Sequence, residues 1–174
     1  AAFNKILAKE RFAVYPHAAE YADRNGPPGS SAAGEQPKFM SVLAHADGTL
    51  EDVIVKFARI DPDNAATRRW GNLLLCEEQA LRLLDEHGIA SARTEILDVD
   101  DWRFLQSTRF DRTMQGGRIG VIPLDALDAT YGGGPGAPWL RSATGLHRQG
   151  FIVATDLERI RLLDAFGQLI GNTD

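Results

Sequence analysis

The feature that most constrains the fold is a run of strand-forming residues, 52–59, with a single lysine in its middle. Apolar residues at positions 53, 55 and 57 alternate with Ile54, Lys56 and Ala58, so a period-2 strand places Lys56 on the same face as Ile54. A lysine at mid-strand is usually solvated at a sheet edge, because lysine is seldom buried without a partner. The sequence therefore raises the question of whether an acidic partner for Lys56 exists.

A candidate partner lies in the next segment, 64–87, which has the apolar spacing of one helix face. The residues that define this face are Trp70, Leu74, Leu81 and Leu84. Glu77 falls in the middle of the stripe, whereas Glu78 lies on the more polar side. Protein-kinase-like folds use a strand lysine and a helix carboxylate to hold the phosphates of ATP. On these residues alone, a carboxylate at the margin of an amphipathic helix is an equally good interpretation of Glu77.

The remaining segments predict a small antiparallel sheet with helices before and after it, an α+β fold. Asp47-Gly48 predicts a hairpin turn between two strands, and the segment 26–38 has the composition of a loop or linker. Thr155 is predicted to cap the last helix, which Gly171 ends. The expected helical segments are 1–25, with a second helix opening at Pro16, then 64–87, 123–130 and 155–170; the expected strands are 39–44, 50–58, 92–99, 102–107 and 119–122.

Composition restricts the function classes. The chain has 174 residues, 44% of them hydrophobic, which suffices for one domain or for a small lobe and part of another. A net charge of -5 argues against a surface devoted to nucleic acid. No apolar run reaches the length of a membrane span, and the lone cysteine, Cys76, suits a reducing compartment, so a cytoplasmic location is expected. The four histidines are scattered, and no metal site is expected from them.

Several of these stretches, in this order, resemble the HipA-like serine/threonine kinases of bacterial toxin–antitoxin systems, and the stand-alone YjjJ-type members in particular. The resemblance runs from about Ser30 to Asp174. It is carried by the loop 31–39, the strand 53–57, the helix around Glu77, the Arg-Phe-Asp-Arg box at 109–112, the Gly-Gly-Pro-Gly loop at 133–136 and the final Leu-Ile-Gly-Asn-Thr-Asp at 169–174. It implies a kinase N-lobe at 30–112 and the start of a helical C-lobe at 113–174. The residues before it, 1–29, are expected to be a helical lead-in segment.

The resemblance also implies a role for individual residues. Lys56 would bind ATP phosphates with Glu77 as its helix partner, and Asp174 would be the catalytic aspartate, taking the proton of a substrate hydroxyl. Ser31 would be the site of autophosphorylation. The phosphate loop would contain Gly34, Gln36 and Lys38, and the hinge that contacts adenine would contain Thr108, Arg109 and Phe110.

The family continues past this aspartate with a histidine, an asparagine and a second aspartate that holds Mg²⁺, and these residues do not occur in the 174 residues here. The sequence is therefore expected to be a piece of a longer protein, nearly inert by itself. The resemblance implies ATP and Mg²⁺ as cofactors, a protein substrate such as an aminoacyl-tRNA synthetase, and an antitoxin or antitoxin-like segment as partner. Two alternatives remain: a non-catalytic nucleotide-binding module, and a domain that interacts with an antitoxin or another partner.

Overall fold

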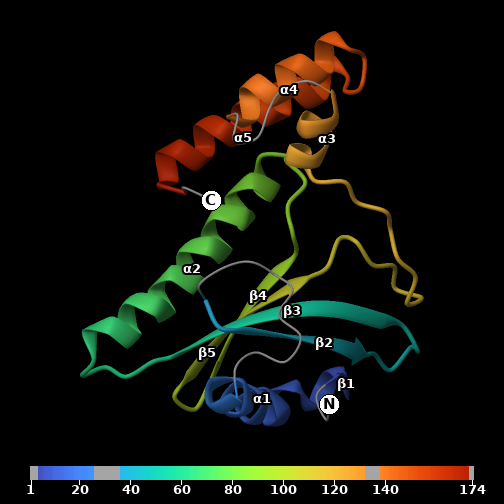
Figure 1. Ribbon diagram of the computed structural model, residues 1–174. Helices are drawn as coiled ribbons and strands as arrows, with labels where there is room; N and C mark the ends of the chain where they lie inside the picture. Colours follow the sequence, from blue (N-terminus) through green and yellow to red (C-terminus); the bar gives the residue numbers. More distant parts are fainter. Residues whose placement is uncertain (1–3, 26–35, 132–137, 173–174) are drawn as a thin grey trace. The chain divides into compact units, whose positions relative to one another are not determined.

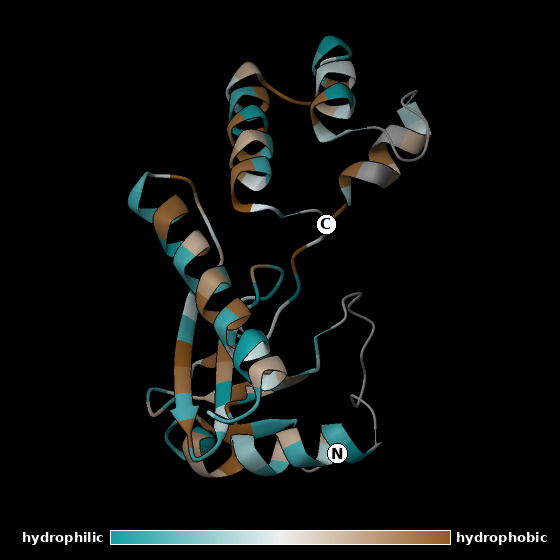
Figure 2. Ribbon diagram, turned by 90° about the vertical axis from the view of Figure 1, so that its left-hand side faces the viewer, coloured by the Kyte–Doolittle hydropathy of each residue, from teal (hydrophilic) through white to brown (hydrophobic). Residues whose placement is uncertain are grey.

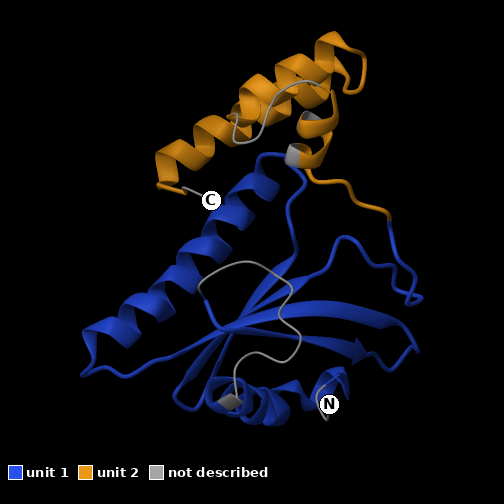
Figure 3. Cartoon of the chain, viewed as in Figure 1, with its two compact units in different colours: residues 1–119 blue, residues 120–174 orange. Residues whose placement is uncertain are grey.

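The chain forms two compact units. The computed structural model describes residues 4–25, 36–131 and 138–172. Unit 1 comprises Ala1–Ile119 and unit 2 comprises Gly120–Asp174 (Figure 3). The sequence placed the lobe boundary between residues 112 and 113; the units separate seven residues later, and the described part of the predicted lead-in segment belongs to unit 1.

Unit 1 is built on a five-stranded sheet with the strand order β1-β2-β3-β5-β4 (Figure 1). The strands are β1 (Lys5–Leu7), β2 (Lys38–Ala44), β3 (Leu50–Arg59), β4 (Thr94–Val99) and β5 (Trp102–Thr108). β1 runs parallel to β2, and the other neighbouring strands are antiparallel. A mostly antiparallel sheet with helices packed on it confirms the predicted α+β class.

The turn between β2 and β3 is the one that Asp47-Gly48 predicted. Gly48 has a φ of +85°, which glycine adopts without steric cost. The Asp47 carboxylate accepts hydrogen bonds from the backbone N–H and the hydroxyl of Thr49, at 2.9 and 2.7 Å. These bonds lower the pKa of Asp47, the hydroxyl bond contributing most. The turn fixes the hairpin register, in which Met40 lies opposite Ile54.

One face of the sheet carries an aromatic core covered by α1 (Arg11–Asn25). Tyr15 of α1 is fully buried, and its ring lies 5.3 Å from Phe39 and 5.5 Å from Phe104, centroid to centroid. Phe57 and Trp102 extend the cluster with centroids 5.6 Å apart. Large buried aromatic side chains contribute most of the apolar area in such a core.

The opposite face of the sheet packs against α2 (Ala65–Glu86), as Figures 1 and 2 show from two sides. The Asn64 side chain caps the helix by accepting from the backbone N–H groups of residues 66 and 67. Leu74 is fully buried against Ala58 of β3 and Leu105 of β5. In Figure 2, hydrophobic and hydrophilic bands alternate along α2, as expected for a helix that covers a sheet with one side.

Unit 2 consists of three helices, α3 (Leu124–Tyr131), α4 (Trp139–Arg148) and α5 (Ala154–Ile170). α4 packs against both α3 and α5. Gly171 follows α5 with a φ of +70°, the left-handed conformation of a helix C-cap, so the predicted stop is confirmed. The predicted start is wrong: Val153 is the N-cap residue, and Thr155 lies inside the first turn.

The N-terminal region differs from its prediction in two ways. α1 begins at Arg11 and continues through Pro16, which the sequence placed at a helix start. Burial of Tyr15 and of the alanines at 18, 19 and 22 against the sheet offsets the roughly 3 kcal/mol that a proline inside a helix costs. Residues 5–7, predicted as helical, form β1, because they find a parallel partner in β2.

Two segments that follow the sheet in the chain differ from what the sequence predicted. Residues 119–122 form no strand, and Val121 and Ile122 are 51% and 65% exposed. A strand needs a hydrogen-bonded neighbour, and among the described residues the nearest pairing is the isolated bridge between Arg112 and Arg118. The second segment is α4, a helix that was not predicted from the sequence.

Candidate functional site

The predicted pair of Lys56 and Glu77 is present on the α2 side of the sheet. The Lys56 Nζ atom donates to both Glu77 carboxylate oxygens, at 2.8 and 2.7 Å. Exposures of 28% for the Lys56 side chain and 33% for that of Glu77 place the pair between surface and core. Glu78 instead pairs with Arg82, with an N···O distance of 3.6 Å. The helix periodicity therefore identified the correct one of two adjacent acids.

The local packing explains why these two side chains meet. Lys56 lies two residues before Ala58 on β3, and Glu77 lies three residues after Leu74 on α2. Ala58 and Leu74 belong to the same buried cluster, so the contact that anchors the helix to the strand also brings the ion pair together. Successive side chains on a strand face are two residues apart, and helix neighbours are three or four apart.

Lys38 lies beside this pair. It is the register partner of Lys56 across the β2–β3 hairpin, so both lysines project from the same face of the sheet, and Lys38 is only 7% exposed. Gln36 lies two residues before it. Two lysines on adjacent strands therefore lie on the same face as Glu77. Positive side chains grouped in this way fit the phosphates of a nucleotide.

The first two of the predicted hinge residues, Thr108 to Phe110, are bonded to residues near the start of β3. The backbone N–H of Arg109 donates to the Asp52 carbonyl at 2.8 Å. The Thr108 hydroxyl donates to the carboxylate of Glu51, which is 7% exposed. Phe110, in contrast, is 73% exposed. The Thr108 N–H also donates to the Arg93 carbonyl at 2.9 Å, so backbone bonds at Thr108 and Arg109 fix this segment while the Phe110 ring stays accessible.

Asp111 joins two arginines after this segment. It accepts from the Arg109 Nε and Nη2 atoms at 2.9 and 2.7 Å, and from the Arg112 Nη1 atom at 2.6 Å. The hydrogen bonds from Arg109 are the main cause that lowers the pKa of Asp111 to about 2, and the same bonds raise the pKa of Arg109. The Arg109 Nη1 atom also lies 3.1 Å from the Met40 sulfur.

The Met40 contact connects the hinge to the lysine site. Met40 lies two residues after Lys38 on the same strand face, so the Arg109 guanidinium reaches the face that carries Lys38 and Lys56. The structure thus brings Lys38, Lys56, Glu77 and Arg109 to one side of the sheet. Three predicted residues, Ser31, Gly34 and Asp174, lie outside the described residues.

Met40 and Asp52 on this side of the sheet were not predicted to belong to the site, and Asp111 and Arg112 were predicted only as members of the 109–112 box. The Arg112 Nε atom lies 3.8 Å from the Asp52 carboxylate, so Asp52 extends the charge network of Asp111. A signal for Asp52 was available, because the alternation that groups Lys56 with Ile54 also places Asp52 on that face. The Arg109–Met40 contact had no local signal, since it joins residues 69 positions apart.

Within residues 4–25, 36–131 and 138–172, apart from the side chains at 125 and 128, no group of three or more His, Cys, Asp or Glu side chains is arranged to hold a metal ion. In the same ranges, none of the helices combines the length and the apolar character needed to cross a membrane.

Comparison with known proteins adds family evidence to this geometry. Residues 30–174 match the model of the HipA-like C-terminal domain. The chain is also 33% identical over 147 residues to the protein named Toxin YjjJ of Escherichia coli (strain K12); the match covers 84% of this chain and 32% of that relative, so the chain spans about a third of its length. No solved structure matches the chain. The family model covers most of the chain, and the chain belongs to the HipA-like C-terminal domain family.

Proposed function

We propose that this chain contributes the ATP-binding part of a serine/threonine protein kinase of the HipA toxin type. The observation that carries the proposal is the Lys56–Glu77 ion pair, which stands on the strand and helix that the kinase arrangement requires. Lys38 on the neighbouring strand adds a second positive charge to the same face. Family membership supports a protein of this type.

In this proposal the chain binds and orients the nucleotide. Lys56 contacts the phosphates. Its ion pair with Glu77 orders the lysine side chain before ATP binds, so binding does not have to supply that conformational entropy. Lys38 and the segment that contains Gly34 and Gln36 line the phosphate end. The segment Thr108 to Phe110 receives the adenine base; the N–H groups of Thr108 and Arg109 hold its backbone in place by donating to the Arg93 and Asp52 carbonyls, so they are not donors to the base.

Proton transfer in the proposal belongs to Asp174, by resemblance to the family. Its carboxylate would accept the proton of a protein serine or threonine hydroxyl as the phosphoryl group transfers. Among the described residues, no cluster of carboxylates fits Mg²⁺. We propose a cytoplasmic protein substrate, with an aminoacyl-tRNA synthetase as the first candidate, and an antitoxin as the partner.

The test uses the full-length protein that contains this chain. Wild type and the variants Lys56→Met, Glu77→Gln and Asp174→Asn are incubated with γ-labelled ATP, Mg²⁺ and a cell extract, with Glu78→Gln as the matched control. We expect Lys56→Met and Asp174→Asn to reduce label transfer by at least roughly 100-fold, Glu77→Gln to raise KM for ATP, and Glu78→Gln to remain near wild type. Undiminished transfer by Asp174→Asn would contradict its role. ATP binding without transfer by the wild type would favour the non-catalytic nucleotide-binding module.

A further inference from the structure

A cavity of about 630 Å³ lies in unit 2, and none of the residues assigned to the Lys56 site lines it. Its volume is within the range of about 300–1,000 Å³ typical of sites for small molecules. Polar residues on its wall come from α3, α4, α5 and the residue after α4: Tyr131, Arg141, Thr144, Arg148, Gln149 and Asp164. Leu140 and Pro138 add apolar surface.

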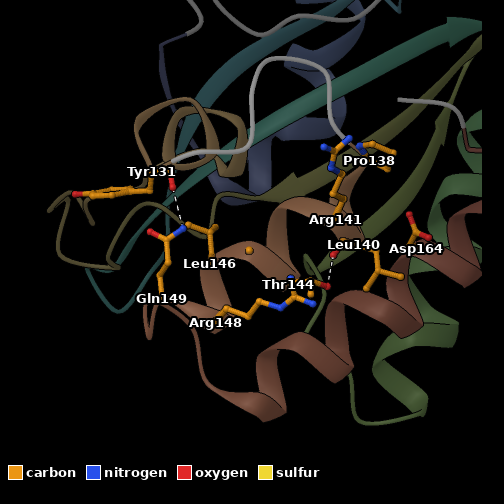
Figure 4. A pocket seen from close by; sticks show the side chains of 10 residues that line it. Tyr131, Pro138, Leu140, Arg141, Thr144, Leu146, Arg148, Gln149 and Asp164 are labelled. Carbon is orange, nitrogen blue, oxygen red and sulfur yellow. Dashed lines mark hydrogen bonds between the residues drawn. The ribbon is translucent and has the colours of Figure 1, made fainter.

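One face of α4 supplies most of the positive charge of this cavity. Arg141, Thr144, Gly145 and Arg148 are spaced at i, i+3, i+4 and i+7, which places them in one row along the helix. The opposite face, with Ser142, Ala143 and Leu146, is buried. Figure 4 shows the Arg148 side chain extending back along the helix toward Thr144, with Arg141 farther along the same cavity.

The arginines of unit 2 fall into two groups, those with a carboxylate partner and those without a described one. Arg159 and Arg161 each have a carboxylate partner on α5, at 3.1 Å from Asp156 and 2.5 Å from Glu158. With the side chains of residues 125 and 128 left aside, Arg141 and Arg148 form no ion pair with the carboxylates that the structure describes. Of the four arginines of unit 2, the two without a described counterion are the two that line the cavity.

The space between the two arginines is open. A Cβ atom added at Gly145 would meet nothing within 4 Å, so a ligand can approach the helix backbone there. Seven residues of α-helix separate the two arginines by about 10 Å along the axis. The Gln149 side chain donates to the Tyr131 carbonyl at 2.8 Å, which fixes one end of the cavity. Asp164 contributes a negative charge to the wall.

We propose that this cavity binds an organic bisphosphate, with one phosphate at Arg141, the other at Arg148, and the body of the molecule over Gly145. Arginine recognises phosphate through paired N–H donors, and two arginines two helix turns apart favour a ligand whose negative groups are separated rather than one compact anion. The apolar side chains of Leu140 and Pro138 receive the carbon skeleton. The site is independent of the proposed kinase function.

The bisphosphate can come from a small metabolite or from a protein segment with two phosphorylated side chains. Three probes separate these sources: fructose 1,6-bisphosphate, fructose 6-phosphate as the control that lacks one phosphate, and a short peptide with two phosphoserines. Each is titrated into the chain by calorimetry at low ionic strength, where charge interactions are least screened. We expect the bisphosphate or the doubly phosphorylated peptide to bind roughly tenfold more tightly than fructose 6-phosphate.

Variants then locate the binding. Arg141→Gln and Arg148→Gln should each weaken binding by roughly tenfold, and the matched control Arg159→Gln should leave it unchanged. Asp164→Asn should strengthen binding by about two- to fourfold, because it removes a negative charge from the wall. The substituted arginines are exposed, so we expect each variant to fold. Circular dichroism checks this expectation.

Two results would overturn the proposal. One is the absence of binding by all three probes at millimolar concentration. The other is binding that Lys56→Gln abolishes and the double variant Arg141→Gln, Arg148→Gln leaves intact, because such binding would belong to the proposed nucleotide site. Conversely, binding that depends on the two arginines and survives Lys56→Gln supports this site even if ATP binding fails.

Discussion

Separating Lys56 from Glu77 should cost more stability than separating any exposed ion pair of the same helix. The perturbation is a double-mutant cycle with Lys56→Met and Glu77→Gln, which isolates the interaction from the other effects of each substitution. Both carboxylate oxygens of Glu77 accept from the Lys56 Nζ atom, at 2.8 and 2.7 Å.

The burial of the two side chains sets the magnitude. Exposed ion pairs contribute about 0–1 kcal/mol, and breaking a fully buried pair costs about 3–5 kcal/mol. With 28% and 33% of the side chains exposed, this pair lies between these limits, and we expect a coupling free energy of about 1.5–2 kcal/mol. The control cycle uses Glu78 and Arg82, with an N···O distance of 3.6 Å and Arg82 53% exposed, for which about 0.3–0.5 kcal/mol is expected.

The assay is urea unfolding followed by tryptophan fluorescence. Trp70→Phe and Trp139→Phe leave Trp102 as the remaining tryptophan, and this residue is 3% exposed in the core of unit 1. Its emission therefore reports the unfolding of unit 1 separately from that of unit 2. A Lys56–Glu77 coupling no larger than that of the control would refute the view that packing around Leu74 holds this pair in a partly desolvated position.

Three smaller predictions concern the support of the site. Asp111→Asn should lower the melting temperature at pH 6, and the effect should diminish as the pH falls. The pKa of Asp111 is about 2 in the folded chain against 3.8 unperturbed. The stabilisation by Arg109 is therefore complete above about pH 4 and is lost as the pH falls through 2. Asn64→Ala should destabilise unit 1 by about 1 kcal/mol in urea unfolding, because it removes the cap of α2, whereas Asn64→Ser should not. Tyr15→Phe should cost about 1 kcal/mol, since it removes the 2.8 Å hydrogen bond to the buried Gln106 side chain; an unchanged urea midpoint would contradict this.

The parts of the fold that were predicted correctly are those encoded by short-range patterns. Alternation along β3, the apolar stripe of α2 and the turn at Asp47-Gly48 each involve neighbours within a few residues. Lys56 and Glu77 could therefore be assigned to facing sides before their contact was known. Their meeting still required the assumption that α2 packs on β3, which the buried contact of Leu74 with Ala58 supplies.

The errors arose where distant partners decide the structure. Residues 5–7 form a strand only because β2, more than 30 positions later, accepts them. α1 passes through Pro16 because tertiary burial outweighs the local penalty. The apolar residues at 119–122 have a strand-like composition, yet no described strand lies beside them, so the composition alone misled. The Arg109–Met40 contact at the site is of the same long-range kind.

The most direct test of the central claim is labelling with an acyl-phosphate derivative of ATP, which transfers its acyl group to lysines beside the bound phosphates. The chain has four lysines, and Lys5 and Lys9 are exposed residues outside the site, so they are internal controls. After digestion, mass spectrometry measures acylation at each lysine with and without excess ATP. The account predicts ATP-protected labelling at Lys56 or Lys38 and unprotected labelling at Lys5 and Lys9. Equal labelling of all four lysines, with no protection by ATP, would contradict it.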